Sequence, residues 1–385
     1  MPITIGVPRE IRQDEQRVAL IPDAAKKLLK QELNVVMETG AGLAIGYRDS
    51  DYEEASIAEA ASDLFARSDI VLSVNPLSLE QIDQLKEGSV VIGFMNPHAD
   101  LERFERLRQR NISAFSVELI PRISRAQAMD ALSSQASIAG YKAVLLAANL
   151  LGKFFPMLTT AAGTIRPSKV LVIGAGVAGL QAIATARRLG AMVEGYDVRA
   201  AVKEQVESLG AKFVDIEIKA EGSGGYAREL TEEEKQQQQE ILARHVAAAD
   251  VIVSTAAIPG RPAPRILSKE MVEAMRGGSV IVDLAAETGG NCELTRAGET
   301  ILHNNVKIHG PVNVPSALGN HASELYAKNL LNFLELLIDD GNININLDDE
   351  IINESLITHA GKIHHAGIRE QLGDNNSDNN QGAGK

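Results

Sequence analysis

Short apolar runs alternate along this chain with longer segments that are apolar on one side. Near the start of the chain, the predicted strands are residues 3–7, 35–38, 70–74, 90–94 and 112–117. Helix-like stretches such as 23–31 and 100–109 lie between them. Strands that alternate with helices indicate a parallel sheet with helices on both faces. We therefore expect a complete α/β domain here, without a glycine-rich turn.

The same alternation returns later in the chain. The predicted strands of this second region are residues 170–173, 192–196, 212–216, 251–255, 280–284 and 306–309. Six strands are the number found in a dinucleotide-binding fold. The charged, glutamine-rich stretch 231–240 is expected to form a solvated helix.

Two long apolar-rich helices are predicted at 136–155 and 323–338, and they would join the two regions. The expected fold class is α/β, with two doubly wound parallel-sheet, Rossmann-like domains. The first domain would be discontinuous, with residues 1–135 and 325–373, and the second would span 136–324. Residues 374–385 are rich in Asn, Asp and Gly and are expected to be disordered.

Composition excludes several classes of function. The net charge of −13 argues against nucleic acid as a partner, because its phosphates need a basic surface. Cys292 is the single cysteine, and the eight histidines show no metal-ligand spacing, so neither a disulfide framework nor a metal is expected. The N-terminus lacks a signal-peptide pattern. The most apolar window, 143–152, is too short to span a bilayer, which needs about 20 residues, so we expect a soluble protein.

The stretch 169–179, Lys-Val-Leu-Val-Ile-Gly-Ala-Gly-Val-Ala-Gly, reads as a buried strand, a glycine turn and the start of a helix. Gly174, Gly176 and Gly179 have the G-x-G-x-x-G spacing. In a nucleotide-binding turn, the first glycine permits the tight bend and the second lets the backbone approach a pyrophosphate. The third lets the helix pack closely on the strand. A βαβ unit without a ligand is the alternative.

The next predicted strand ends at Asp197, at about the distance where a carboxylate accepts both ribose hydroxyls of NAD. A phosphate on the 2′-oxygen would meet the charge of Asp197. The expected cofactor is therefore NAD(H) rather than NADP(H).

A polar segment lies between the two α/β regions. It contains Arg122, Arg125, Gln127 and Asp130, and Ser133 follows. We expect NAD(H) in the cleft between the two domains, where this segment would meet its reactive end. A polar linker that caps the long helix is the alternative, and it stays open. The segment offers no His or Lys as a proton shuttle. Hydride passage between two nicotinamide rings needs no such shuttle, but it needs both rings aligned and dry.

From its start to about Ile363, the chain resembles the NAD(H)-binding component of proton-translocating nicotinamide nucleotide transhydrogenase, the first domain of its alpha subunit. The most specific stretch is 121–134, Pro-Arg-Ile-Ser-Arg-Ala-Gln-Ala-Met-Asp-Ala-Leu-Ser-Ser. Further similarity lies in residues 138–141, 160–163, 198–201, 203–206, 258–264 and 289–292.

The resemblance implies a set of site residues. Those implied to act on the reaction are Arg122, Gln127, Asp130, Ser133 and Tyr226, the last on a mobile loop that folds over bound nucleotide. Those implied to contact the cofactor are Arg122, Ile123, Ser124, Arg125, Gln127, Gly174, Ala175, Gly176, Val177, Gly179, Asp197, Val198, Arg199, Gly225, Tyr226, Gln238 and Ala257.

Alanine dehydrogenases are related in fold, and residues 6–10 and 17–19 are similar to theirs. Those enzymes use a Lys in the segment matching 70–76 and a His near 94–97. This chain has Ser73 in the first segment and Met95-Asn96 in the second, and His98 lies about three residues further on. The catalytic pair of amino-acid oxidation is therefore missing.

The resemblance also implies the function. The chain would present NADH to NADP(H) on a partner subunit, with hydride transfer coupled to proton translocation, and would be inactive without that partner. The implied partners are a second copy in a homodimer, a membrane-spanning subunit and the NADP(H)-binding beta subunit. The expected location is the cytoplasm, peripherally at the inner or plasma membrane, as the split form of the alpha subunit. A soluble amino-acid dehydrogenase and a catalytically silent NAD-binding regulator remain the alternatives.

Overall fold

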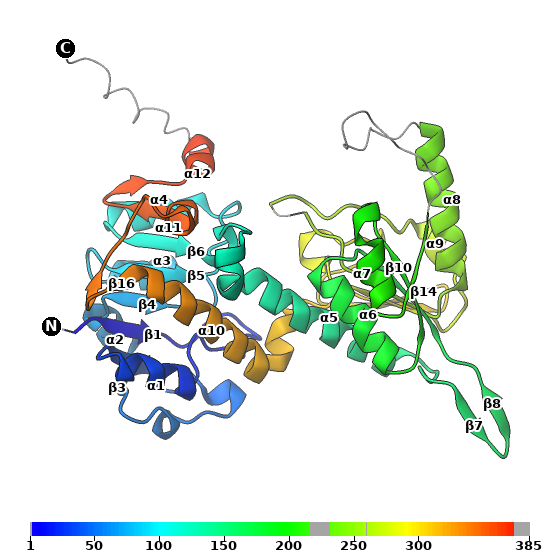
Figure 1. Ribbon diagram of the computed structural model, residues 1–385, viewed down its shortest axis with the longest axis horizontal. Coiled ribbons are helices and arrows are strands. Elements are labelled where there is room, and N and C mark those ends of the chain that lie inside the picture. The colour runs from blue at the N-terminus through cyan, green and yellow to red at the C-terminus, as the bar shows by residue number, and fades with distance from the viewer. Residues whose placement is uncertain (1, 216–231, 259, 373–385) are drawn as a thin grey trace, which may run out of the picture. The chain divides into compact units, whose positions relative to one another are not determined.

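A computed structural model of the chain describes residues 2–215, 232–258 and 260–372 (Figure 1). The chain divides into two compact units, one with residues 1–135 and 316–385 and the other with residues 136–315. It enters the second unit inside helix α5 (Ala131–Leu150) and leaves it shortly before helix α10 (Gly319–Leu337). The sequence placed this return later, at residue 325, because the polar start of α10 lacks the apolar pattern of its remainder.

The first unit is built on a sheet of eight strands among the described residues, in the order β19-β18-β6-β5-β4-β1-β2-β3. Their bounds are β1 Thr4–Val7, β2 Asn34–Glu38, β3 Ser56–Ala58, β4 Ile70–Leu72, β5 Val90–Gly93, β6 Ser113–Ser116, β18 Leu356–His359 and β19 Lys362–Ile363. Strands β1 to β6 run parallel, whereas β18 and β19 form an antiparallel edge. The sequence analysis did not anticipate β3, β18 or β19. Strands β3 and β19 have only three and two residues, whereas β18 is as long as β1.

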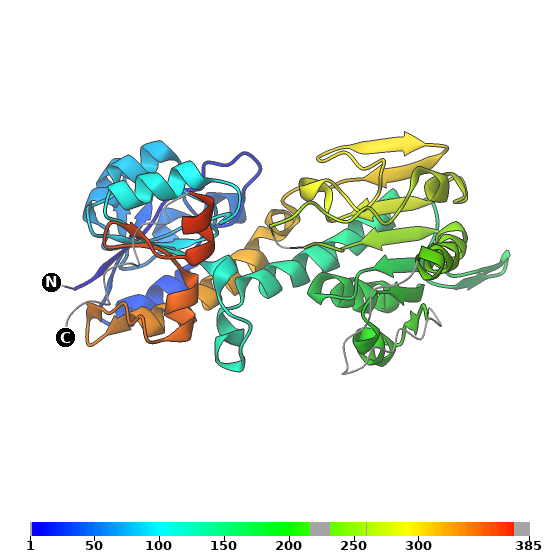
Figure 2. The ribbon, with the colours of Figure 1, turned by 90° about the horizontal axis from the view of Figure 1, so that it is seen from above.

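Helices cover both faces of this sheet (Figure 2). Besides α10 they are α1 Pro22–Lys30, α2 Ala61–Arg67, α3 Leu79–Gln84, α4 Leu101–Gln109, α11 Glu350–Ser355 and α12 Ala366–Gln371. The two-residue period of a strand explains the two layers. Ile70 and Leu72 of β4 lie in the core that contains α1 and α10, whereas Val71 lies in the core that contains α2, α3 and α4.

The second unit has a sheet of seven described strands in the order β11-β10-β9-β12-β13-β15-β14. Their bounds are β9 Lys169–Ile173, β10 Met192–Tyr196, β11 Lys212–Phe213, β12 Val251–Ser254, β13 Val280–Asp283, β14 Thr300–His303 and β15 Val306–His309. The first six strands of this order are parallel, as predicted, and β14 pairs antiparallel with β15. Strand β11 is shorter than predicted, and the predicted end at residue 216 lies outside the described residues.

The helices of the second unit are α6 Val177–Arg188, α7 Lys203–Ser208, α8 Glu232–Ala248, α9 Lys269–Glu273 and most of α5. Helix α8 extends beyond the predicted solvated stretch, and its second half buries Leu242 and Val246 in the core. A hairpin of β7 (Leu158–Thr160) and β8 (Gly163–Ile165) completes the unit. Within the described parts of the chain, no helix is long and apolar enough to cross a bilayer.

The parallel strands of both units follow the same order. Numbered along the chain within each unit, they read 3-2-1-4-5-6, which is the order of the dinucleotide-binding fold. The order reverses between β1 and β4 in the first unit and between β9 and β12 in the second. Ligands of open α/β sheets bind at the carboxyl ends of the strands beside such a reversal. These two positions are therefore the first places to look for a site.

Candidate nucleotide-binding site

The glycine turn follows β9 at the strand reversal of the second unit. Gly174 has a φ of +90°, which favours glycine, and the carbonyl of Gly174 accepts a 3.0 Å hydrogen bond from Thr255 Oγ1. A Cβ atom on Gly179 would lie 1.8 Å from the carbonyl oxygen of Gly174, so α6 could not pack here with a larger residue. A Cβ atom on Gly176 would meet nothing within 4 Å. Gly174 and Gly179 therefore serve the fold, and Gly176 borders open space.

Helix α6 begins at this open space. Its N-cap is Gly176, which has no side chain to cap the N–H groups of the first turn. The amino end of a helix carries a partial positive charge, and its N–H groups bind anions such as phosphate. The turn and the helix end thus fit a pyrophosphate.

Asp197 lies directly after β10, next to the glycine turn. The carboxylate accepts hydrogen bonds from the backbone N of Ala175 at 2.7 Å and from N, Nε and Nη2 of Arg199 at 2.9 Å each. Burial raises the pKa of Asp197, but the bonds from Arg199 and Ala175 outweigh burial and lower that pKa. The Asp197 side chain is 6% exposed, whereas the Arg199 side chain is 59% exposed. An ionised carboxylate is therefore covered by a guanidinium that faces solvent.

Exposed apolar side chains follow the ends of three adjacent strands. Val177, Val198 and Ile258 are 44%, 75% and 48% exposed, and they follow β9, β10 and β12 respectively. Large exposed apolar residues at a strand reversal suit the apolar faces of a nucleotide. Ala257, next to Ile258, is also exposed.

Gln238 of α8 reaches the same region from the side. Its Nε2 donates a 2.9 Å hydrogen bond to Tyr196 Oη, and Tyr196 immediately precedes Asp197. Asn291 holds the loop after β12, a role that the sequence analysis did not predict. The Asn291 carboxamide accepts from Ala256 N at 3.0 Å and donates to the carbonyls of Ala256 and Pro264. Its position in a Gly-Gly-Asn turn was the available signal.

The segment Arg122–Ser133 belongs to the first unit. A short 3₁₀ helix, Ser124–Met129, buries Ala126 and Met129 and leaves Gln127 exposed. Arg122 and Ser124 are also exposed, and Ile123 is partly buried. The Asp130 carboxylate accepts hydrogen bonds from the backbone N of Ser133 at 2.8 Å and from its Oγ at 2.6 Å. Asp130 thus caps the start of α5, as in the linker alternative, while Gln127 and Arg122 face solvent.

Arg125 is bound inside the first unit. Its Nη1 and Nη2 donate to the two carboxylate oxygens of Asp349 at 2.7 and 2.8 Å. Asp349 is in turn the N-cap of α11. Gly225 and Tyr226 lie outside the described residues.

The strand reversal of the first unit has no glycine turn. Instead, the partly buried Glu10 carboxylate accepts from the backbone N atoms of Val74 at 2.6 Å and Asn75 at 3.1 Å. Its neighbour Glu15 accepts from Arg17 Nε and Nη2 and from Asn75 Nδ2. Burial raises the pKa of Glu10 to about 7. Burial also raises the pKa of Glu15, but the Arg17 guanidinium outweighs it and lowers that pKa to about 2.

The neighbouring strand ends of the first unit carry amides. Asn75 follows β4 and Asn96 follows β5, while His98 is exposed. The Glu118 carboxylate accepts from the backbone N atoms of Met95 and Asn96. Because an amide cannot take up or release a proton near neutral pH, Asn75 and Asn96 cannot act as acid or base.

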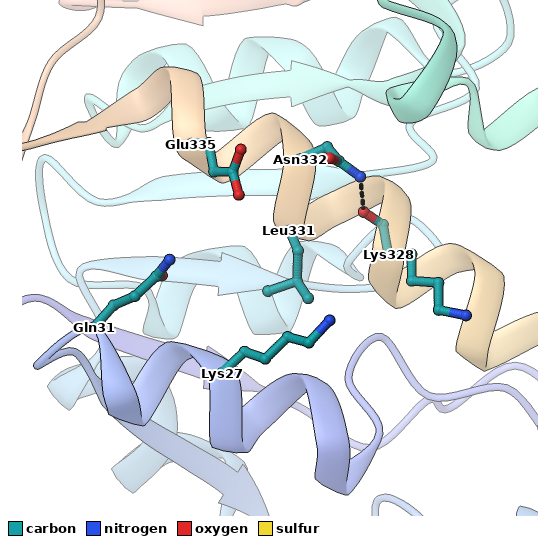
Figure 3. A pocket seen from close by; sticks show the side chains of 6 residues that line it. All are labelled: Lys27, Gln31, Lys328, Leu331, Asn332 and Glu335. Atoms are coloured by element: carbon teal, nitrogen blue, oxygen red, sulfur yellow. Dashed lines mark hydrogen bonds between the residues drawn. The ribbon is translucent and has the colours of Figure 1, made fainter.

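A separate surface hollow lies between α1 and α10 (Figure 3). Its lining residues are Lys27, Gln31, Lys328, Leu331, Asn332 and Glu335. None of the predicted site residues lines it, so it is not the candidate nucleotide site. No group of three or more His, Cys, Asp or Glu side chains in the described residues could hold a metal ion.

Comparison with known proteins agrees with this geometry. A family model described as "Alanine dehydrogenase/PNT, N-terminal domain" matches residues 6–139, and one described as the C-terminal domain of the same family matches 143–366. A Rhodospirillum rubrum protein, named as the first part of NAD(P) transhydrogenase subunit alpha, is 44% identical over 95% of this chain and 99% of that protein.

Two solved structures show the likeness in three dimensions. The transhydrogenase from Sinorhizobium meliloti has a TM-score of 0.83 and 41% identity, covering 94% of this chain and 99% of that one. An L-alanine dehydrogenase has a TM-score of 0.80 and 26% identity, covering 97% and 99%. The chain is thus similar to both branches in fold and more similar in sequence to the transhydrogenase.

Proposed function

The chain belongs to the alanine dehydrogenase/PNT family, and we propose that it is the NAD(H)-binding component of an NAD(P) transhydrogenase. In this function, hydride passes directly between NADH on this chain and NADP⁺ on a partner subunit. One observation carries the proposal. The second unit has a nucleotide-type glycine turn. In the first unit, the ends of β4 and β5 carry the amides Asn75 and Asn96, whereas amino-acid oxidation would need a titratable group there.

The second unit would bind the adenosine and pyrophosphate of NAD(H). The amino end of α6 and the open space at Gly176 suit the pyrophosphate. The Asp197 carboxylate suits the ribose hydroxyls and would repel a 2′-phosphate, which favours NAD(H) over NADP(H). Before a ribose can bind, the Arg199 guanidinium must give up hydrogen bonds to the Asp197 carboxylate, and because the Arg199 side chain is exposed it can swing into solvent. Gln238 and Ala257 would border the same nucleotide.

The segment Arg122–Ser133 would orient the nicotinamide. Bound NADH supplies the hydride, so this chain has to align the ring and exclude water rather than move a proton. Gln127 and Arg122 have exposed side chains that can contact a ligand, and Asp130 and Ser133 hold each other in place. Gly225 and Tyr226 are proposed to cover the bound nucleotide.

Two carboxylates of the first unit are already hydrogen bonded. The Glu10 carboxylate is bound by the backbone at the end of β4, and the Asp130 carboxylate is bound by Ser133. The preference for transfer between nucleotides over an alanine-type dehydrogenase therefore rests on the amides Asn75 and Asn96 rather than on these carboxylates.

The remaining proposals concern assembly. We infer a membrane-spanning subunit and an NADP(H)-binding beta subunit as partners, with transfer coupled to proton translocation and this chain peripheral to the membrane on its cytoplasmic side. A homodimer is supported by the β7–β8 hairpin, which stands away from the second sheet with every residue of its strands exposed (Figure 1). Leu158 and Ile165 are 36% and 45% exposed, and a lone two-stranded hairpin is marginally stable in water. A second copy would cover it.

A pair of assays tests the function. In one assay, the pure chain is mixed with NADH and an NADP⁺-loaded transhydrogenase partner domain, and transfer is followed by absorbance. In the other assay, the chain alone receives NAD⁺ and L-alanine. We expect transfer with the partner domain and no turnover of alanine. Turnover of alanine without a partner would instead establish the dehydrogenase alternative, and tight NADH binding without transfer would establish the silent regulator.

A further inference from the structure

Asn329 of α10 lies beneath the segment Arg122–Ser133. It is 9% exposed, and both ends of its carboxamide are used. Its Nδ2 donates a 2.9 Å hydrogen bond to the carbonyl oxygen of Ala128. Its Oδ1 accepts a 2.8 Å hydrogen bond from Ser134 Oγ. One buried side chain thus joins two parts of the chain that are six residues apart.

These two contacts bracket the residues assigned to the nicotinamide. Ala128 directly follows Gln127, and Ser134 directly follows Ser133. Between them, the Asp130 carboxylate holds the N and Oγ of Ser133. Asn329 therefore fixes the turn from the helix below, while Asp130 fixes it from within.

Gln135, the residue after Ser134, also ties this segment to α10. Gln135 Nε2 donates to Ser134 Oγ at 3.3 Å and to the carbonyl of Ala322 on α10 at 3.1 Å. Arg17 Nη1 donates to Gln135 Oε1 at 3.1 Å. Buried networks whose members are satisfied keep a segment rigid, because breaking one bond leaves a polar group without a partner.

Asn332, one turn further along α10, offers a matched comparison. Its amide donates mainly to the carbonyl of Lys328 on its own helix, at 2.6 Å (Figure 3). Its distance to the Ala128 carbonyl is 3.4 Å, and its side chain is partly exposed. Asn332 touches the same carbonyl but does not bridge to Ser134 in any contact that the structure describes.

We propose that Asn329 is a positioning residue for hydride transfer, holding the segment that carries Gln127 and Asp130 in its working shape. This inference rests on the proposed function. Asn329→Asp keeps the size of the side chain and the acceptor for Ser134. It removes the N–H donor and places a carboxylate against the Ala128 carbonyl, so the segment should loosen on the side of Gln127.

The expected effect falls on transfer rather than on binding. A shift of about 1 Å at the nicotinamide costs on the order of a hundredfold, so Asn329→Asp should slow transfer by about tenfold to a hundredfold. The dissociation constant for NADH should stay nearly unchanged, because Asp197 and the glycine turn belong to the second unit. Asn332→Asp should transfer at close to the unmodified rate. Lowering the pH should restore transfer in Asn329→Asp alone, because a protonated carboxyl donates again.

The experiment compares the unmodified full chain, Asn329→Asp and Asn332→Asp with an NADP⁺-loaded partner domain. Stopped-flow transfer, NADH titration and amide hydrogen exchange over residues 126–134 are recorded for each. Faster exchange and slower transfer confined to Asn329→Asp would support the inference. Unmodified transfer in Asn329→Asp, or equal losses in both variants, would overturn it.

Two further results keep the outcomes separate. If Asn329→Asp does not fold, as judged by thermal melting, Ser134→Ala removes the other end of the bridge, and normal transfer in it would count against the inference. If the unmodified chain transfers no hydride at all, the proposed function fails. The exchange comparison on the chain alone still shows whether Asn329 holds the segment.

Discussion

The two units share one strand order but treat the position of its reversal in opposite ways. In the second unit, the loop after β9 is a glycine turn that borders open space at Gly176. In the first unit, the loop after β1 places the Glu10 carboxylate on the backbone N–H groups of Val74 and Asn75. In the first unit, the Glu10 carboxylate thus lies at the strand reversal, which is where dinucleotide-binding folds hold an anionic ligand. The comparison shows that strand order offers a site, and that the loop residues decide whether a ligand can use it.

The strongest test of this comparison is a substitution in the glycine turn. Gly179→Ala should destabilise the second unit by about 3 kcal/mol or more, because the new methyl group would lie 1.8 Å from a backbone oxygen. Gly176→Ala is the control, since its methyl group meets nothing within 4 Å. It should leave the melting temperature nearly unchanged and still weaken NADH binding. Equal melting temperatures for both variants would contradict the roles given to the two glycines.

The stability of the first unit should depend on pH because of Glu10. The pKa of Glu10 is about 7 in the folded chain against an ordinary value of 4.5, so the folded state holds this proton more tightly. The resulting stability is fully present below pH 4.5 and is lost as the pH rises through 7. The loss is at most about 3 to 4 kcal/mol. Glu10→Gln should remove this dependence.

Denaturant unfolding of both chains from pH 4.5 to 8 measures the difference. Subtracting the two curves isolates Glu10 from histidines that titrate in the same range. Glu15 does not interfere, because its lowered pKa of about 2 affects stability at more acidic pH. If the difference in unfolding free energy between the two chains does not vary with pH, the role given to Glu10 in the first unit is wrong.

In the second unit, the residue to test is Asp197, whose carboxylate is proposed to bind the ribose. Asp197→Ala should weaken NADH binding by about 1.5–3 kcal/mol, the range for hydrogen bonds to charged groups. Arg199→Ala should weaken binding less or even strengthen it, because it uncovers the same carboxylate. Fluorescence titration with NADH decides, and an unchanged dissociation constant in Asp197→Ala would remove Asp197 from the site.

The smallest expected effect concerns Arg125. The resemblance to the family implies a cofactor contact, whereas the structure shows a pair with Asp349. Ion pairs open to solvent contribute little to stability, so Arg125→Ala should lower the melting temperature only slightly. Asp349→Ala should lower it more, because it also removes the N-cap of α11. If Arg125 also contacts nucleotide, NADH binding will weaken in Arg125→Ala and not in Asp349→Ala.

Much of this fold could be predicted, because parallel strands buried on both faces have continuous apolar runs that stand out in the sequence. The edge strands β3, β14 and β19 were missed because each is short or only partly apolar, and the inner strand β18 was missed although it is buried and four residues long. The glycine turn and Asp197 could be found because their spacing reflects backbone constraints. Asn329 could not be found, because its partners Ala128 and Ser134 lie about two hundred residues away and no local spacing marks such contacts. For Asn291 the Gly-Gly-Asn turn was the one local signal.

The central claim is that this chain gives hydride directly to NADP⁺ on a partner. The measurement uses NADH with deuterium at the transferred position of the nicotinamide, the pure chain and an NADP⁺-loaded partner domain. We predict that the deuterium appears in NADPH without exchange with water, and that transfer requires both proteins. Loss of the label to water, or reduction of NADP⁺ without this chain, would contradict the account.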